Sequence, residues 1–113
     1  MSAYIVGWVE IKDDERFAEE YAKHVLQHVA KYGGKLLAAA DTVDVREGRW
    51  PAGRTILYEF PDMESIDRWY TGPEYHPMIE IRQKYADTTL AFVPGLPPGF
   101  DGNDPATLNE DGE

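Results

Sequence analysis

The spacing of hydrophobic residues along the chain changes from one segment to the next and so predicts a series of elements. Residues 4–11 (YIVGWVEI) are β-branched and aromatic, which predicts a strand. Both faces of this strand are apolar, although an antiparallel sheet usually leaves one face to water. We therefore expect helices to cover one face of the sheet and a second subunit to cover the other.

A helix follows this strand. Asp13 and Asp14 can cap its start, and a Gly-Gly pair after Tyr32 ends it, so the predicted helix spans residues 15–32. At about 100° per residue one stripe of the helix is apolar and faces the core. The stripe consists of Phe17, Tyr21, Val25, Val29 and Tyr32.

The rest of the chain predicts three more strands and two more helices. The strands span residues 35–45, 54–60 and 88–93, and the helices span 63–70, capped by Asp62, and 74–86. The order strand, helix, strand, strand, helix, strand is that of the ferredoxin-like fold. We predict an α+β protein with a ferredoxin-like βαββαβ topology and an antiparallel sheet, which dimerises sheet to sheet into an α+β barrel.

Composition and charge narrow the class of protein. The chain has 113 residues, of which 42% are hydrophobic, which suits one globular core. It has no cysteine, which excludes disulfides, thiolate metal sites and cysteine nucleophiles. The net charge of −10 makes nucleic acids and anionic membranes poor partners. No segment has the length of a membrane span or the pattern of a signal peptide, so we expect a cytoplasmic protein.

The charge is distributed unevenly and suggests a boundary. Residues 96–113 hold five acids and no base, together with several prolines and glycines. We therefore predict one folded domain over residues 1–95 and an acidic, Pro- and Gly-rich tail over residues 96–113.

Four segments match a known family in order. They are AYIVGWVEI, KYGGKLLAA, EGRWPAGRTILYEFPDMES and WYTGPEYHPMIEIRQKYADTTLAFVPG. Over residues 3–95 the chain resembles the DUF1330 family of small dimeric α+β-barrel proteins. The resemblance implies a ferredoxin-like protomer and a dimer with facing sheets, but no reaction. Similar barrels include cofactor-free monooxygenases, muconolactone isomerases and polyketide cyclases, which act in a pocket between sheet and helices.

Two histidines on the first helix are candidates for chemistry. His24 and His28 lie on one helix face, and on the helical projection His28 falls inside the buried stripe and His24 at its edge. Their imidazoles could transfer protons near neutral pH, or one could pack in the core and the other be solvated. They depart from the family's pattern, so no role is inherited. With His76 or a carboxylate they could also bind zinc, but no HExxH or cysteine supports this, and we predict no metal and no cofactor.

Two arginines are candidates for holding an anion. Arg82 lies on the apolar side of its predicted helix, and Arg54 begins a strand. A guanidinium at a core edge either pairs with an acid such as Glu59 or binds an anionic substrate group. The sequence leaves both interpretations open.

These residues predict a cofactor-independent small-molecule enzyme that works by acid/base proton transfer. The reaction would be an isomerase, cyclase or lactone/lyase-type step on an unsaturated or aromatic-like organic acid or carbonyl compound. His28 would be the acid or base, His24 its helper, and Arg82 or Arg54 the anion anchor. The expected substrate-binding residues are Trp8, Trp69, Tyr70, Tyr75 and Glu59. The alternative is a non-catalytic ligand-binding or assembly dimer.

Overall fold

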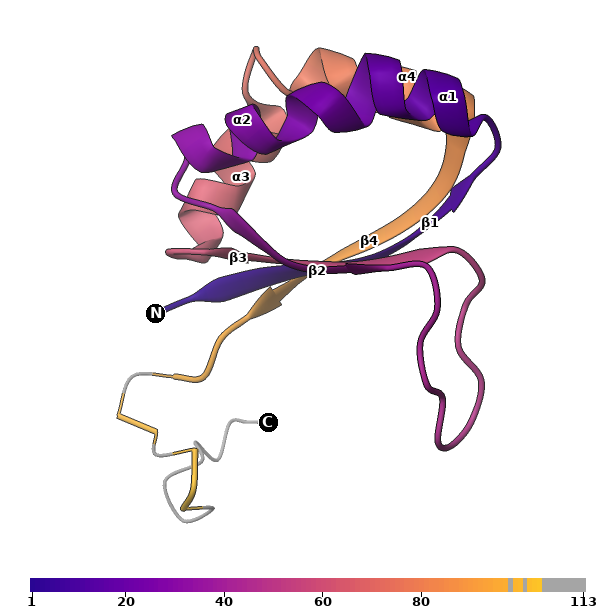
Figure 1. The fold of residues 1–113 in the computed structure, drawn as a ribbon. Coiled ribbons are helices and arrows are strands. Elements are labelled where there is room, and N and C mark those ends of the chain that lie inside the picture. Colours follow the sequence, from indigo (N-terminus) through magenta and orange to yellow (C-terminus); the bar gives the residue numbers. More distant parts are fainter. Residues whose placement is uncertain (98, 101, 105–113) are drawn as a thin grey trace.

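One antiparallel sheet carries all the helices on one face (Figure 1). The structure, a computed structural model, describes residues 1–97, 99–100 and 102–104, so the predicted tail over 96–113 lies mostly outside the described residues. The strands β1 (Ala3–Ile11), β2 (Lys35–Ala40), β3 (Arg54–Phe60) and β4 (Ala86–Pro94) lie in the order β2-β3-β1-β4. The predicted ferredoxin-like topology is confirmed.

The first helix is continuous but not uniform. It consists of α1 (Asp14–Phe17), the π-helical segment η1 (Ala18–Ala22) and α2 (Lys23–Lys31). Asp13 caps it, because the Asp13 carboxylate accepts a hydrogen bond from the backbone N–H of Arg16 at 3.1 Å. Gly33, with φ of 84°, follows its end. The predicted helix is confirmed, whereas the periodicity does not predict its π-helical segment.

The π-helical segment brings the apolar side chains of the predicted stripe into line and leaves the two histidines off this line. A π-helix closes i→i+5 hydrogen bonds, so each residue advances by less than the ~100° of an α-helix. The residues that are buried along this helix therefore recur at every fourth position: Phe17, Tyr21, Val25 and Val29. His24 and His28 are turned off this line and are half-buried. The prediction that His28 lies inside the buried stripe is wrong for this reason.

The second half of the chain adds α3 (Met63–Thr71) and α4 (His76–Tyr85). The Asp62 carboxylate caps α3 by accepting a hydrogen bond from the backbone N–H of Ser65 at 2.7 Å, as predicted. Strand β4 starts directly after α4, two residues before the predicted Thr88. None of the described helices is both long and apolar enough to cross a membrane.

The second strand is shorter than predicted. Its pairing with β3 stops at Ala40, opposite Thr55, rather than continuing to Val45. The next residue, Asp41, forms an ion pair with Arg54 instead of a strand pairing. Residues 41–53 then form a long loop that extends away from the sheet, on the side opposite the helices (Figure 1).

The two faces of the sheet have different surroundings. Ile5 and Val9 of β1 are buried beneath the helices, and the alternate side chains point to the other face. No helix covers that other face within the described residues (Figure 1). We name it the open face; its apolar residues include Tyr4, Val6, Trp8, Leu57 and Val93.

Gly7, in the middle of β1, leaves room for its neighbours on the helix-covered face. It pairs with Ile56 of β3 and Leu90 of β4. A Cβ atom at this position would lie 2.5 Å from Leu90 Cδ2 and 2.8 Å from the backbone oxygen of Thr89. The backbone atom cannot move aside cheaply, so any side chain here would strain the sheet.

We expect Gly7→Ala to lower the free energy of unfolding by about 1–3 kcal/mol, because it overpacks a tightly packed region. The measurement is equilibrium unfolding in urea. Gly102→Ala is the matched control: its Cβ would meet only Leu96 Cδ1, at 3.8 Å, and we expect a change within about 0.5 kcal/mol. Equal stability of the two variants would contradict this account of Gly7.

Candidate functional site

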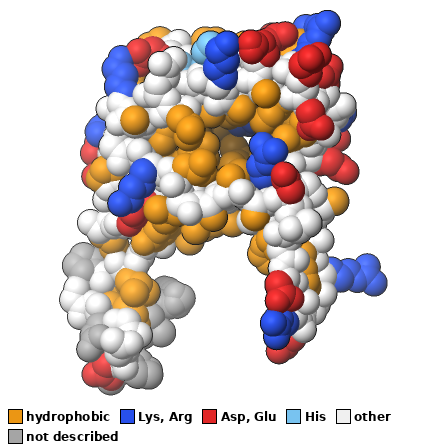
Figure 2. Space-filling view, viewed as in Figure 1, with side chains coloured by type: hydrophobic (Ala, Val, Ile, Leu, Met, Phe, Trp, Pro, Cys, Tyr) orange, Lys and Arg blue, Asp and Glu red, His pale blue; other side chains and the backbone are white. Residues whose placement is uncertain are grey.

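A cavity of about 120 Å³ lies between the helices and the sheet. Figure 2 shows a hollow of the surface surrounded by hydrophobic side chains. The floor of the cavity is formed by Ile5, Val9, Ile56 and Leu90, and residues of α2 and β2 such as Leu26 and Leu36 also line it. An apolar cavity of about 150 Å³ can hold benzene, so this one is suited to a ligand of about one ring.

The guanidinium of Arg82 adds a positive charge to this apolar cavity. The residue is only 5% exposed, and its Nη1 donates a hydrogen bond to the Tyr75 hydroxyl at 2.7 Å. Arg82 forms none of the ion pairs found among the described residues. A buried charge is normally paired, because leaving it alone carries a large desolvation penalty. The charge of Arg82 is thus not neutralised by an acid within the described chain.

Two tyrosine hydroxyls extend this contact into a chain. The hydroxyls of Tyr75 and Tyr21 lie 2.7 Å apart, and either one can donate the hydrogen bond. Since Tyr75 accepts from Arg82, it is free to donate to Tyr21, and the Tyr21 hydrogen is then available to a ligand. The aromatic ring of Trp69 stacks on Tyr75 at 4.0 Å between ring centroids and holds it in place.

The protonation states of these groups follow from burial. Burial raises the pKa of Tyr75, Tyr21 and Tyr58, so all three cavity-lining phenols are neutral near pH 7. Burial alone would lower the pKa of Arg82, but the phenol oxygens of Tyr75 and Tyr21 outweigh it and raise that pKa, so the guanidinium stays charged. The cavity therefore offers a fixed cation beside neutral hydrogen-bond donors.

Three polar atoms of cavity-lining residues are buried without a hydrogen-bond partner among the described residues. They are Trp69 Nε1, Arg82 Nε and Thr88 Oγ1. Such atoms are rare in folded proteins and call for an explanation such as a ligand or an ordered water. Two of the three are N–H groups, which only donate. Two residues of the lining thus keep an unused N–H donor, and one of them is the unpaired cation Arg82, a combination that suits an oxyanion.

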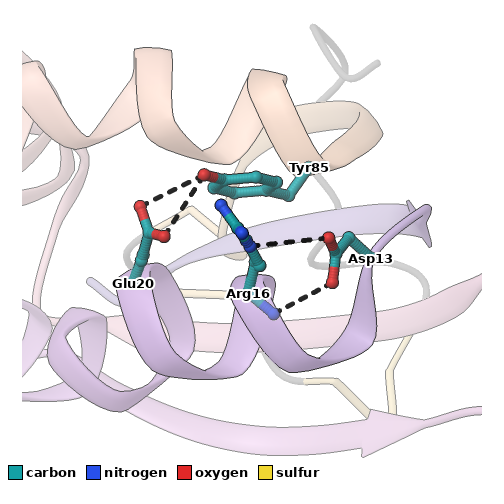
Figure 3. Close-up of polar contacts among 4 residues, drawn as sticks. All are labelled: Asp13, Arg16, Glu20 and Tyr85. Carbon is teal, nitrogen blue, oxygen red and sulfur yellow. Dashed lines mark hydrogen bonds and ion pairs between the residues drawn. The ribbon is translucent and has the colours of Figure 1, made fainter.

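A second polar contact joins η1 to α4. The Tyr85 hydroxyl, at the end of α4, donates to the two carboxylate oxygens of Glu20 at 3.3 and 3.2 Å (Figure 3). Glu20 precedes Tyr21 within η1, and Tyr85 lies one helical turn after Arg82. This contact therefore ties η1 to the helix that carries Arg82. Figure 3 also shows Asp13 beside Arg16 where the helix begins.

Four of the predicted site residues line the cavity: Arg82, Arg54, Trp69 and Tyr75. Arg54 differs from Arg82 because its Nε donates to Asp41 at 2.8 Å, which lowers the pKa of Asp41. Tyr70 lies behind the lining, where its ring contacts those of Trp69 and Tyr75.

The other predicted site residues lie elsewhere. Trp8 and Glu59 are on the open face because strand alternation places them opposite the cavity floor. Trp8 packs against Trp50, and Glu59 forms an ion pair with Lys35 at 3.7 Å. The sequence left open an ion pair between Glu59 and Arg54 or Arg82. This interpretation is wrong, since both arginines line the cavity on the helix-covered side of the sheet.

The two helix histidines are not among the residues that line the cavity. His28 lies near Glu74, on the side of α2 that faces the α3–α4 connection. Its catalytic role, and that of His24 as its helper, stay predictions. Within residues 1–97, 99–100 and 102–104, no group of three or more His, Cys, Asp or Glu side chains could hold a metal ion.

Sequence reasoning missed Tyr21, Tyr58 and Thr88 as site residues. The periodicity places Tyr21 in the buried stripe, where a hydroxyl needs a hydrogen-bond partner, and that need is the signal that points to Tyr21. Tyr58 and Thr88 lie on strands, where the choice between the two sheet faces decides whether a side chain reaches the cavity.

The fold and cavity define a ferredoxin-like α+β protein with a small pocket between sheet and helices. The pocket contains the positively charged side chain of Arg82. Residues 2–96 match the family described as "Domain of unknown function (DUF1330)". The chain belongs to this family, as its motifs indicated. No curated protein matches it.

Solved structures with the same fold include proteins of several kinds. RPA0582, a protein of unknown function from Rhodopseudomonas palustris, has 17% identity and a TM-score of 0.68, with 86% of this chain and 84% of that chain covered. SnoaB, a cofactor-independent oxygenase from Streptomyces nogalater, has 10% identity and a TM-score of 0.58, with coverage of 85% and 94%. An antibiotic biosynthesis monooxygenase has 16% identity and a TM-score of 0.52, with coverage of 86% and 100%. At these identities the likeness concerns the fold alone.

We expect Arg82→Met to leave the free energy of unfolding within about 1 kcal/mol of the wild-type value or to raise it, because an apolar side chain of similar length avoids the burial of an unpaired charge. Unfolding in urea measures this. Arg68→Met is the control, since Arg68 is exposed on α3, where it forms a surface ion pair with Glu64 and donates a hydrogen bond to Ser65 Oγ at 3.3 Å. A loss of more than about 3 kcal/mol in Arg82→Met would show that Arg82 serves stability instead.

Proposed function

We propose that this protein is a cofactor-independent small-molecule enzyme that binds an organic acid or carbonyl compound in the cavity and acts by proton transfer. The observation that carries this proposal is Arg82, buried in an apolar cavity without an acid partner among the described residues. The ligand would place a carboxylate, phenolate or enolate oxygen near the guanidinium and the Tyr21 hydroxyl. The unused donors of Arg82 and Trp69 support the same orientation.

The chemistry of such a site is the stabilisation of negative charge. A fixed cation and oriented hydroxyl groups in a water-poor cavity stabilise an enolate more strongly than water does. An enolate is the intermediate of isomerisation, of cyclisation and of many lactone and lyase steps. Arg82 would hold the developing oxyanion, Tyr75 would position Arg82 and Tyr21, and the apolar floor would contact the rest of the substrate.

One observation favours a second candidate, a non-catalytic ligand-binding dimer. The described residues that line the cavity include no histidine, aspartate or glutamate. A bound ligand would therefore touch no side chain of ordinary basicity, and the proton would have to leave by way of water or of groups outside the cavity. Turnover of a bound carbonyl compound distinguishes the two candidates, because both require the same binding site.

We also propose that two copies of the chain associate through their open faces. The open face is rich in apolar side chains, among them Val6, Trp8 and Leu57, and the helices lie on the opposite side of the sheet (Figure 1). An apolar sheet face of this kind is typical of an interaction surface rather than of a surface in contact with water. A second copy would bury these side chains against their equivalents.

We expect Arg82→Met to abolish the binding of small aromatic acids, phenols and enols that stabilise the wild-type protein. At 100 times its dissociation constant a ligand adds about 2.7 kcal/mol, which thermal unfolding detects easily. His28→Ala, a change outside the cavity lining, should bind as the wild type does. Undiminished binding to Arg82→Met would refute the anion site, whereas loss of turnover alone in His28→Ala would restore that histidine as the acid or base.

We expect Val6→Asp to convert a dimer into a monomer, because it places a charge in the centre of the apolar open face. Sedimentation equilibrium of both proteins measures the change in mass. Gln27→Asp, on the exposed side of α2, adds the same charge away from that face and should remain dimeric. A wild-type protein that is monomeric at micromolar concentration would contradict the proposed assembly.

A further inference from the structure

The cavity adjoins a second, more polar cleft. Both are lined by Val9, Phe17, Ala22 and Arg54, so the two lie side by side, with these four residues at their boundary. The outer cleft is additionally lined by three acidic residues: Glu10, Asp14 and Asp41. The inner cavity and the outer cleft therefore differ in the sign of their charge.

The charges of the outer cleft are mostly uncompensated. Asp41 is paired with Arg54, so the one guanidinium at the boundary is already neutralised. Glu10 and Asp14 are exposed and form no ion pair in the part of the chain that the structure describes. The chain as a whole carries a net charge of −10. An anion that approaches this side of the cavity meets negative charge before it reaches Arg82.

We infer that the natural ligand reaches the cavity as a neutral weak acid, a phenol or an enol, and becomes an anion only inside, beside Arg82. This inference rests on the proposed function, because it names the class of ligand that the same site takes. A carboxylic acid of similar size is already ionised at neutral pH and is repelled by the outer cleft. A phenol or enol with a pKa of about 10 is uncharged at neutral pH and is not repelled by the acidic residues.

The ionisation step is a simple proton transfer to water. The ligand O–H bond breaks, its electron pair stays on the oxygen, and the proton forms hydronium with a water molecule of the outer cleft. The oxyanion is then held by Arg82, while the negative charges of Glu10 and Asp14 favour the departing proton. No oxidant, metal or further reactant is needed to balance this step.

The groups that face the ligand all favour its ionised form or are neutral. Arg82 of α4 is an unpaired cation, Arg54 of β3 is paired with Asp41, and Tyr75, Tyr21 and Tyr58 are neutral phenols. No carboxylate or imidazole lines the cavity among the described residues. A nearby opposite charge lowers the pKa of an acid, whereas apolar walls raise it, and the unpaired guanidinium decides the balance here.

The test uses 4-nitrophenol, whose anion absorbs visible light, and 4-nitrobenzoate, which has the same ring with a permanent charge. We expect the pKa of protein-bound 4-nitrophenol to fall by about one unit or more, read from the nitrophenolate absorbance against pH. At about pH 5.5, where 4-nitrophenol is mostly neutral and 4-nitrobenzoate is ionised, we expect the association rate constant of 4-nitrobenzoate to be at least about tenfold lower, because the repulsion acts on its approach. The double variant Glu10→Gln/Asp14→Asn should bind 4-nitrobenzoate faster and leave the association rate of neutral 4-nitrophenol unchanged.

The outcomes separate this inference from the proposed function. If 4-nitrobenzoate associates as fast as neutral 4-nitrophenol, or if the bound phenol keeps its solution pKa, the inference is overturned while the anion site stands. If both probes bind equally to wild type and to Arg82→Gln, the site itself is refuted. Tyr75→Phe, which removes only the hydroxyl that contacts Arg82, provides a second variant should Arg82→Gln not fold, and it should reduce the pKa shift.

Discussion

The hydrogen bond from Arg82 to Tyr75 is the contact around which the site is arranged. It holds a charged side chain in an apolar cavity where no described carboxylate neutralises it. The helix α4 places Arg82 there because the same apolar side also buries Met78 and Tyr85. Tyr21 and Trp69 then fix Tyr75 from two sides. An arrangement that gives up the usual ion pair makes physical sense when a ligand provides the negative charge.

Much of the fold can be predicted from local chemistry. Asp13 and Asp62 cap the helices where their positions indicate, and segments rich in β-branched and aromatic residues place the strands, although β2 ends earlier than predicted. The π-helical segment η1 cannot be predicted in this way, because a helical projection assumes one fixed angle per residue. With that assumption the projection predicts His28 inside the buried stripe, whereas in the structure His28 lies off the stripe and is half-buried.

Only part of the site can be predicted from the sequence, because helix residues and strand residues differ in how clearly their pattern shows which way they face. The helical period alone places Arg82 on a buried side, so a candidate anion anchor emerged from the sequence. Strand residues carry no such information, because either face of a sheet can meet the helices. For that reason the residue pattern predicts Trp8 and Glu59 in a pocket that they do not line, and it does not predict Tyr58, which lines that pocket.

The central claim is that Arg82 has no acid partner because it binds an anionic ligand, and this claim can be tested at a single N–H group. The Arg82 Nε–H group has no hydrogen-bond partner among the described residues, and its NMR resonance can be assigned by comparison with Arg82→Gln. During a titration with 4-nitrophenol this resonance should move in proportion to the bound fraction obtained from the absorbance. A resonance that stays in place while the ligand binds would contradict the account.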